Sequence, residues 1–168
     1  MNFFDFIRWN HAIEHATIHI LSRMTPFTSM AGRSISRGFY IYGDLPTELL
    51  QQAVQEAIER LQSGERHLAI HPNCGTNMIA SAVLAAGGTM LAVTGSRKRG
   101  LIEQIPAGIL GALLGVVIGQ LVGMRMQARL TTNADVPPVQ VAAIERKQLG
   151  KRVYHWIELA YAPQAHPK

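Results

Sequence analysis

Gly111-Ala-Leu-Leu-Gly115-Val-Val-Ile-Gly119-Gln-Leu-Val-Gly123 lies within a run, residues 105–124, that carries no charged side chain. Glycine returns at every fourth position, so these glycines lie along one side of a helix and let another helix approach closely. So much glycine weakens a helix in water, whereas a bilayer forces backbone hydrogen bonds to close within the segment. Because a membrane span needs about 20 residues, the run predicts a transmembrane helix.

A second uncharged run, residues 77–95, precedes the first and is also rich in small residues. Ser81, Ala85 and Thr89 recur at four-residue intervals and offer a matching surface for the glycines. The two runs therefore predict a transmembrane helical hairpin over residues 77–124. Two alternatives stay open: the hairpin could be the buried core of a soluble protein, and the glycines could meet a second copy of the chain in a homo-oligomer.

The composition is typical of a membrane protein with a soluble part. Charged residues make up 16% of the 168 residues, below the roughly 25% of ordinary soluble domains. The formal net charge of +5 owes much to Arg97, Lys98 and Arg99, which lie between the two apolar runs. Because no aromatic residue interleaves this basic cluster, it favours the lipid bilayer as the partner and argues against nucleic acid.

The expected location rests on the single cysteine, Cys74, which has no second cysteine for an intrachain disulfide. Basic residues flank the hairpin on both sides, so the positive-inside rule gives no orientation. A free thiol fits the reducing cytosol better than an oxidising compartment, and no cleavable signal peptide is visible. We therefore expect a multi-pass cell-membrane protein whose soluble part is cytoplasmic.

The periodicity of the remaining chain predicts an α+β fold. We expect a small strand-helix-strand unit with an N-terminal amphipathic helix, together with the two-helix transmembrane hairpin. Three domains are expected: an N-terminal soluble or interfacial domain with a metal site, the hairpin, and a C-terminal segment packing on the soluble domain, over residues 1–76, 77–124 and 125–168. Outside the hairpin, the predicted elements are a helix over 2–24, a strand over 34–42, a helix over 44–62, a strand over 67–71, a helix over 139–149 and a strand over 151–160.

The first helix contains His11-Ala-Ile-Glu14-His15, the pattern H-x-x-E-H. Residues four apart share one face of a helix, so His11 and His15 could hold one metal ion, with Glu14 directed toward it. This is the inverted form of the zinc-protease motif, in which the glutamate activates a water. The alternative is an amphipathic helix with satisfied histidines at its margin, although burying these groups without partners is costly. His19 lies one turn after His15, but its side chain is expected to point in a different direction from that of Glu14.

A second metal-like turn, His71-Pro72-Asn73-Cys74, lies just before the hairpin. Two donors separated by two residues can bind one ion from a tight turn, so His71 and Cys74 are candidate ligands. The alternative is an ordinary turn that leads into a helix and buries a cysteine by chance. His67 is a further candidate through the period of a strand, with an ordinary surface histidine as its alternative.

These residues carry a resemblance to a family. The pattern H-x-x-E-H followed by H-P-x-C-G-T resembles the YqhQ-like bacterial membrane proteins, an uncharacterised family. The tract Thr131-Thr132, Pro137 and Gln140-Val-Ala142 is similar to that family's tract after its last apolar helix, and residues 43–77 look still more like a compact sister family of unknown function. The resemblance implies an integral membrane protein without supplying a reaction, and this chain has fewer apolar helices than the YqhQ-like proteins. The positions to which it points are His11, Glu14, His15, His71 and Cys74.

Two functions are compatible with these motifs. In a membrane-bound zinc hydrolase, most simply a peptidase, His11, His15, His71 and Cys74 would bind zinc or another divalent ion. Glu14 would then be the catalytic base on a metal-bound water. If all four ligands bind, however, the tetrahedral site is closed and resembles a structural one. The alternative is therefore a non-enzymatic assembly or scaffolding protein with a structural metal site, in which Glu14 orients a ligand histidine.

Overall fold

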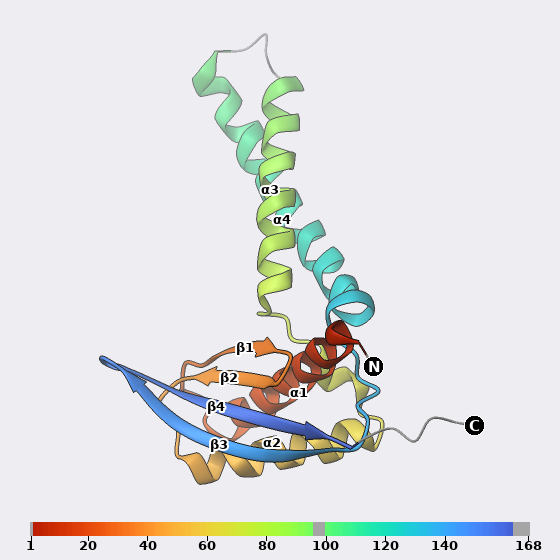
Figure 1. The fold of residues 1–168 in the computed structure, drawn as a ribbon. Helices are drawn as coiled ribbons and strands as arrows, with labels where there is room; N and C mark the ends of the chain where they lie inside the picture. Colours follow the sequence, from red (N-terminus) through yellow and green to blue (C-terminus); the bar gives the residue numbers. More distant parts are fainter. Residues whose placement is uncertain (1, 96–99, 163–168) are drawn as a thin grey trace, which may run out of the picture. The chain divides into compact units, whose positions relative to one another are not determined.

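The computed structural model describes residues 2–95 and 100–162 (Figure 1). The basic cluster at 97–99 lies outside the described residues, so its role stays a prediction. Contacts divide the chain into two units, which are described separately below. One comprises residues 1–71 with residues 130–168, and the other comprises residues 72–129.

The first unit begins with helix α1, Phe3–Met24, which confirms the predicted N-terminal helix. Asn2 caps it: the Asn2 side chain accepts a hydrogen bond from the Asp5 backbone N–H, and the Asp5 carboxylate accepts one from the Asn2 backbone N–H. This reciprocal arrangement satisfies two donors that the helix leaves unpaired. The cap fixes where the helix begins.

A four-stranded antiparallel sheet forms the second layer of this unit, in the order β1-β2-β4-β3. Strands β1, Ala31–Ile35, and β2, Gly38–Tyr42, form a hairpin where the sequence predicted one strand. Strand β4, Arg152–Tyr161, confirms the predicted closing strand and lies between β2 and β3, Val139–Leu149. The C-terminal strands thus belong to the same sheet as the N-terminal hairpin.

Besides the single strand predicted over 34–42, two further predicted elements are wrong. Residues 139–149 form strand β3 instead of a helix, because pairing with β4 outweighs the helix propensity of Ala143, Glu145 and Lys147. Residues 66–69 form a short 3₁₀ helix, η1, Arg66–Ala69, instead of opening a strand over 67–71. Its consecutive residues Leu68 and Ala69 are both buried, which the alternation of a half-buried strand does not allow.

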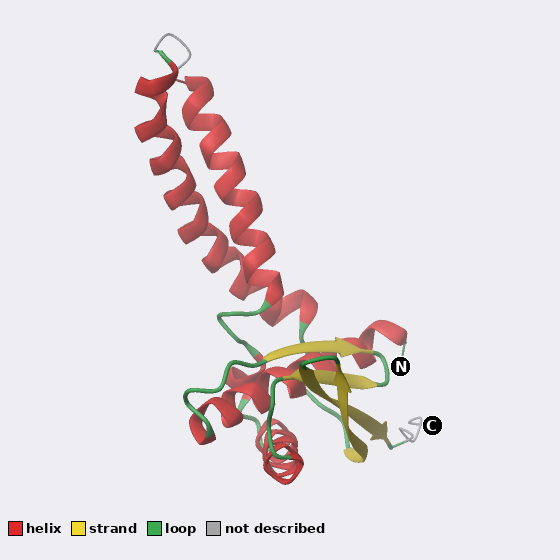
Figure 2. Ribbon diagram, turned by 90° about the vertical axis from the view of Figure 1, so that its left-hand side faces the viewer, coloured by secondary structure: helices red, strands yellow, loops and turns green. Residues whose placement is uncertain are grey.

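The core lies between the sheet and two helices, α1 and α2, Thr47–Gln62 (Figure 2). Phe39 and Ile157 project from the inner face of the sheet, and Ile13 and Leu50 come from the helices; all four are fully buried. The α+β prediction is therefore confirmed.

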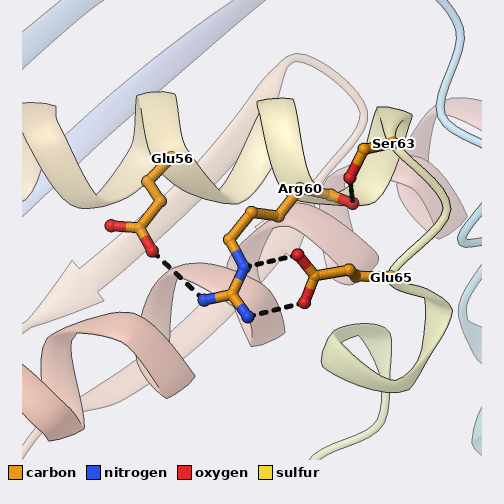
Figure 3. Close-up of polar contacts among 4 residues, drawn as sticks. All are labelled: Glu56, Arg60, Ser63 and Glu65. Carbon is orange, nitrogen blue, oxygen red and sulfur yellow. Dashed lines mark hydrogen bonds and ion pairs between the residues drawn. The ribbon is translucent and has the colours of Figure 1, made fainter.

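An arginine fork joins the end of α2 to η1 (Figure 3). Arg60 donates two hydrogen bonds to the carboxylate of Glu65, at 2.9 and 2.6 Å, and one to Glu56 at 3.1 Å. These bonds hold the pKa of Glu65 below its usual value. Paired forks of this kind fix orientation as well as distance, so the fork helps to set the direction in which the chain enters residues 66–71.

The second unit is a hairpin of α3, Gly75–Gly95, and α4, Leu101–Met126, which run side by side (Figure 2). As predicted, glycines of α4 pack closely against the backbone of α3. A Cβ at Gly115 would fall on the backbone of Leu84, and one at Gly119 on the backbone of Ser81. The glycines therefore face α3 of the same chain, and self-association through them stays a prediction.

Polar groups close one end of this hairpin. Asn77 and Gln127 are fully buried, and the Gln127 amide donates a hydrogen bond of 2.6 Å to the Asn77 side-chain oxygen. The Asn77 amide in turn donates to the Pro72 carbonyl at 2.8 Å. Large apolar side chains project outward along both helices. Those exposed by more than half include Met78, Ile79, Val83, Met90, Leu91, Ile109, Leu110, Leu113, Leu114, Val117 and Leu121.

By length and composition, two helical segments could cross a membrane: residues 75–95 and residues 102–131, where the second includes a short π-helical extension of α4. The predicted pair of apolar helices is therefore present.

Candidate metal centre

Three histidines follow one another at successive turns of α1: His11, His15 and His19. The ring centroids of His11 and His15 are 4.3 Å apart. His71, which follows η1, places its ring 5.9 Å from that of His15 and 4.8 Å from that of His19. The first unit therefore gathers four imidazoles into one cluster, which we call the histidine cluster.

Backbone carbonyls fix the rings of His11 and His15. His11 Nδ1 lies 2.9 Å from the Thr131 carbonyl oxygen, and His15 Nδ1 lies 2.7 Å from that of Ala69. A carbonyl oxygen can only accept a hydrogen bond, so Nδ1 must carry the hydrogen in both rings. In a neutral imidazole the other nitrogen, Nε2, then keeps its lone pair. Both residues therefore present Nε2 as a metal donor.

His19 is fixed in the opposite sense. Its Nε2 lies 2.9 Å from the Ile70 carbonyl oxygen, so Nε2–H donates and Nδ1 keeps the lone pair. Metal-binding histidines ordinarily donate their second ring N–H to a carbonyl or carboxylate in this way, which fixes the tautomer and the ring direction. The carbonyls that hold His15 and His19 come from Ala69 and Ile70, so one short segment orients two rings.

Glu14 lies on the sheet side of α1. Its carboxylate is buried and accepts a hydrogen bond of 2.5 Å from the Ser34 hydroxyl on β1. A Cβ at Gly32 would overlap this carboxylate, so glycine is needed there to make room. Burial raises the pKa of Glu14, while the Ser34 hydrogen bond and the nearby His11 oppose the rise. Glu14 is thus anchored to Ser34, and a catalytic role for it stays a prediction.

His71 is half-buried, and burial lowers its pKa to about 4, with His19 and His15 adding to the effect. The ring is therefore neutral near pH 7, as a ligand must be. Cys74 belongs to the second unit, where it is buried and its carbonyl accepts the backbone N–H groups of Asn77 and Met78 at the start of α3.

Among the described residues, His11 and His15 of the first unit, with Cys74 of the second as a candidate third ligand, are a set of donors that could hold a metal ion. Three of the four predicted ligands thus belong to that set. The fourth, His71, lies beside His15 and His19. The full ligand assignment stays a prediction.

The structure places His19 beside His71, and it shows a role for Ser34 and Gly32 that the sequence did not predict. The spacing of His11, His15 and His19 was a usable signal, because positions i, i+4 and i+8 stay near one helical face. Ser34 and Gly32 gave no such signal, since their importance comes from the pairing that places β1 against α1.

Residues 6–144 match the family described as "Domain of unknown function (DUF6391)". The chain belongs to this family. The DUF6391 match spans the histidine cluster, Glu14, Cys74 and both apolar helices.

A relative of this DUF6391 chain is an uncharacterized protein of Picosynechococcus sp. (strain ATCC 27264 / PCC 7002 / PR-6). The two are 40% identical over 91 residues, which is 49% of this chain and 44% of the relative. The match thus spans less than half of the relative's length. No solved structure matches the chain.

Proposed function

We propose that this DUF6391 chain is a multi-pass membrane protein that binds a divalent metal ion, with zinc as the first candidate. The observation that carries the proposal is the fixed tautomer of His11 and His15. Each ring donates Nδ1–H to a backbone carbonyl, and each therefore offers Nε2 from the same face of one helix. Zinc binds imidazole nitrogen and cysteine thiolate readily, which suits this donor set.

Cys74 is the proposed third ligand. It follows His71 by three residues, so the chain holds its Cα within about 11 Å of the His71 Cα. His71 itself lies beside His15. A thiolate would add a negative charge to two neutral imidazoles, which favours a divalent cation. The fourth position would be filled by His71 in a structural site or by water in a catalytic one.

The exposure of α3 and α4 supports the membrane part of the proposal. A core helix of a soluble protein is mostly buried, whereas only 11% and 17% of the two apolar windows are buried within the chain. A bilayer would cover the outward-facing leucines, isoleucines and valines. A reduced Cys74 thiol supports a cytoplasmic location for the first unit. We also propose that the shared H-x-x-E-H and H-P-x-C-G-T patterns reflect kinship with the YqhQ-like proteins.

Two roles for the bound ion follow from Glu14. The hydrogen bond of Glu14 with Ser34 and its close contact with Gly32 favour a structural metal centre. In that case Glu14 stabilises the packing of α1 on β1, and the protein serves in assembly or scaffolding. Its raised pKa and its closeness to His11 favour the second candidate, a metallohydrolase or peptidase with Glu14 as the base.

Metal analysis of the full chain, purified in detergent, tests the shared claim. We expect one tightly held ion per chain, lost in both His15→Ala and Cys74→Ser. His67→Gln is the matched control, because His67 is exposed on η1 and outside the donor set. Full metal content in both ligand variants would contradict the site.

Glu14→Gln separates the two roles. The glutamine oxygen can still accept the Ser34 hydrogen bond, so the fold should persist under either role. As a structural centre, the protein keeps its function and changes only in stability or metal retention. As a hydrolase, it keeps its metal and loses cleavage of a fluorogenic peptide library that the wild-type chain cleaves.

A further inference from the structure

His19 and His71 form a close pair next to His15, one of the proposed ligands of the first ion. Their ring centroids are 4.8 Å apart with the planes inclined at 60°. His19 donates Nε2–H to the Ile70 carbonyl, so its Nδ1 lone pair remains for another partner. His71 follows Ile70 directly in the chain, so the segment that orients the first ring also carries the second.

We propose that His19 and His71 form a second, weaker metal site, adjacent to the one at His11 and His15. The inference rests on the proposed function in that both ions enter the same histidine cluster. It assigns to His19 a role that the H-x-x-E-H and H-P-x-C patterns leave out. It also assigns His71 to the second ion, which leaves the first ion with three protein ligands and one open position.

The spacing of the rings fits a shared ion. A zinc–nitrogen bond is about 2.0–2.1 Å long, so the centre of a bound imidazole lies about 3.2 Å from the ion. Two imidazoles on one ion therefore have centroids no more than about 6.4 Å apart, and about 5 Å apart at a tetrahedral angle. The separation of 4.8 Å between His19 and His71 meets this condition.

The donors define the chemical class of the ion. Two neutral imidazoles suit Zn²⁺, Ni²⁺ and Cu²⁺, whereas Mg²⁺ and Ca²⁺ prefer oxygen ligands. Both rings are partly exposed, so water can complete the coordination. With only two protein ligands the second ion is held more weakly and exchanges faster than the first.

The second site lies next to a ligand of the first. His15 is buried, and its ring centroid lies 4.3 Å from that of His11 and 5.9 Å from that of His71. An ion bound at the half-buried pair is therefore one imidazole away from the inner site.

Titration of the chelator-stripped full chain in detergent with Zn²⁺ alone, followed by calorimetry, tests this inference. The wild type is expected to bind two ions per chain, one tightly and one weakly. His19→Gln should lose the weak ion and keep the tight one. His67→Gln is the control and should bind as the wild type does, because His67 is an exposed histidine of the same segment.

His71→Gln is the second variant and should likewise lose the weak ion, so the test stands if His19→Gln does not fold. Two ions bound by a folded His19→Gln or His71→Gln chain would overturn the inference. One ion bound by the wild type, unchanged in either variant, would overturn it while leaving the proposed function in place. A wild-type chain that binds no zinc would overturn both.

Discussion

The two units of the chain bury opposite kinds of side chain. In the first unit, large apolar residues such as Ile13, Phe39 and Leu50 are fully buried between the helices and the sheet. In the second unit the small residues lie between the helices, with Gly115 and Gly119 against the backbone of α3, and the large apolar residues point outward. Large apolar side chains therefore face the interior in the first unit and the surroundings in the second.

This difference fits the proposal that the second unit lies in a bilayer and the first in water. In water the hydrophobic effect drives large apolar side chains inward. In a bilayer the lipid tails are as apolar as the helix surface, so the hydrophobic effect does not drive helices together. Close backbone packing through small residues stabilises the helix pair instead. The absence of charge in residues 77–95 and 105–124 agrees with the proposed membrane location of these two helices.

Truncating one leucine in each unit should give the largest effect and tests the difference between the units. Leu50→Ala in the core of the first unit should lower the free energy of unfolding by about 3 kcal/mol, because it leaves a cavity. Leu113→Ala on the outward face of α4 should cost less than about 0.5 kcal/mol, because that side chain is 59% exposed. Thermal unfolding of both variants in detergent measures the difference; equal losses would contradict the inverted arrangement.

Gly115→Leu should destabilise the hairpin by about 2 kcal/mol, because the added side chain would collide with the backbone of Leu84. Gly87→Leu is the control, since a Cβ at Gly87 meets no atom within 4 Å. Protease resistance of the hairpin in detergent checks both. If the two variants are cleaved equally fast, the glycines do not serve the packing of α3 on α4.

The pH dependence of stability tests the burial of His155 in the first unit. Burial lowers the pKa of His155, a fully buried residue of β4 whose Nε2 lies 3.2 Å from the Thr47 hydroxyl. The unfolded chain therefore takes up a proton at this histidine before the folded chain does, and stability falls as the pH drops through the ordinary histidine value of about 6.5. Melting temperatures between pH 5 and pH 8 should fall less in His155→Gln; an unchanged slope would count against this origin.

The smallest effect is expected at the arginine fork. Glu65→Gln removes the charge opposite Arg60, and because both groups reach solvent the loss of stability should be the smallest of these variants. Added salt should shrink the difference from the wild type in thermal unfolding. A larger, salt-independent loss would mean that the fork controls the path of η1 more tightly than its exposure implies.

Much of the fold could be predicted because its signals are local. The cap at Asn2 and the stop near Thr25-Pro26 define α1, and the glycine spacing defines the face of α4. Strand β3 could not be predicted, because a register shift between Val141 and Ala143 interrupts the alternation that would have marked it. Its identity depends on β4, a partner that local propensity does not include.

The candidate site was predictable in its residue types and less so in its arrangement. His11, His15 and Cys74 were predicted as ligands from spacing, because metal donors on one helix or turn obey simple periods. The pairing of His19 with His71 depends on where residues 66–71 cross α1, and a 3₁₀ turn there, in place of a strand, sets that crossing.

X-ray absorption at the zinc edge, on the full chain loaded with one equivalent of zinc, tests the central claim most directly. The account predicts one sulfur at about 2.3 Å and nitrogens at about 2.0 Å from the ion. Cys74→Ser should remove the sulfur, and His15→Ala should reduce the nitrogen signal. A zinc ion surrounded only by nitrogen and oxygen, identical in the wild type and in Cys74→Ser, would contradict it.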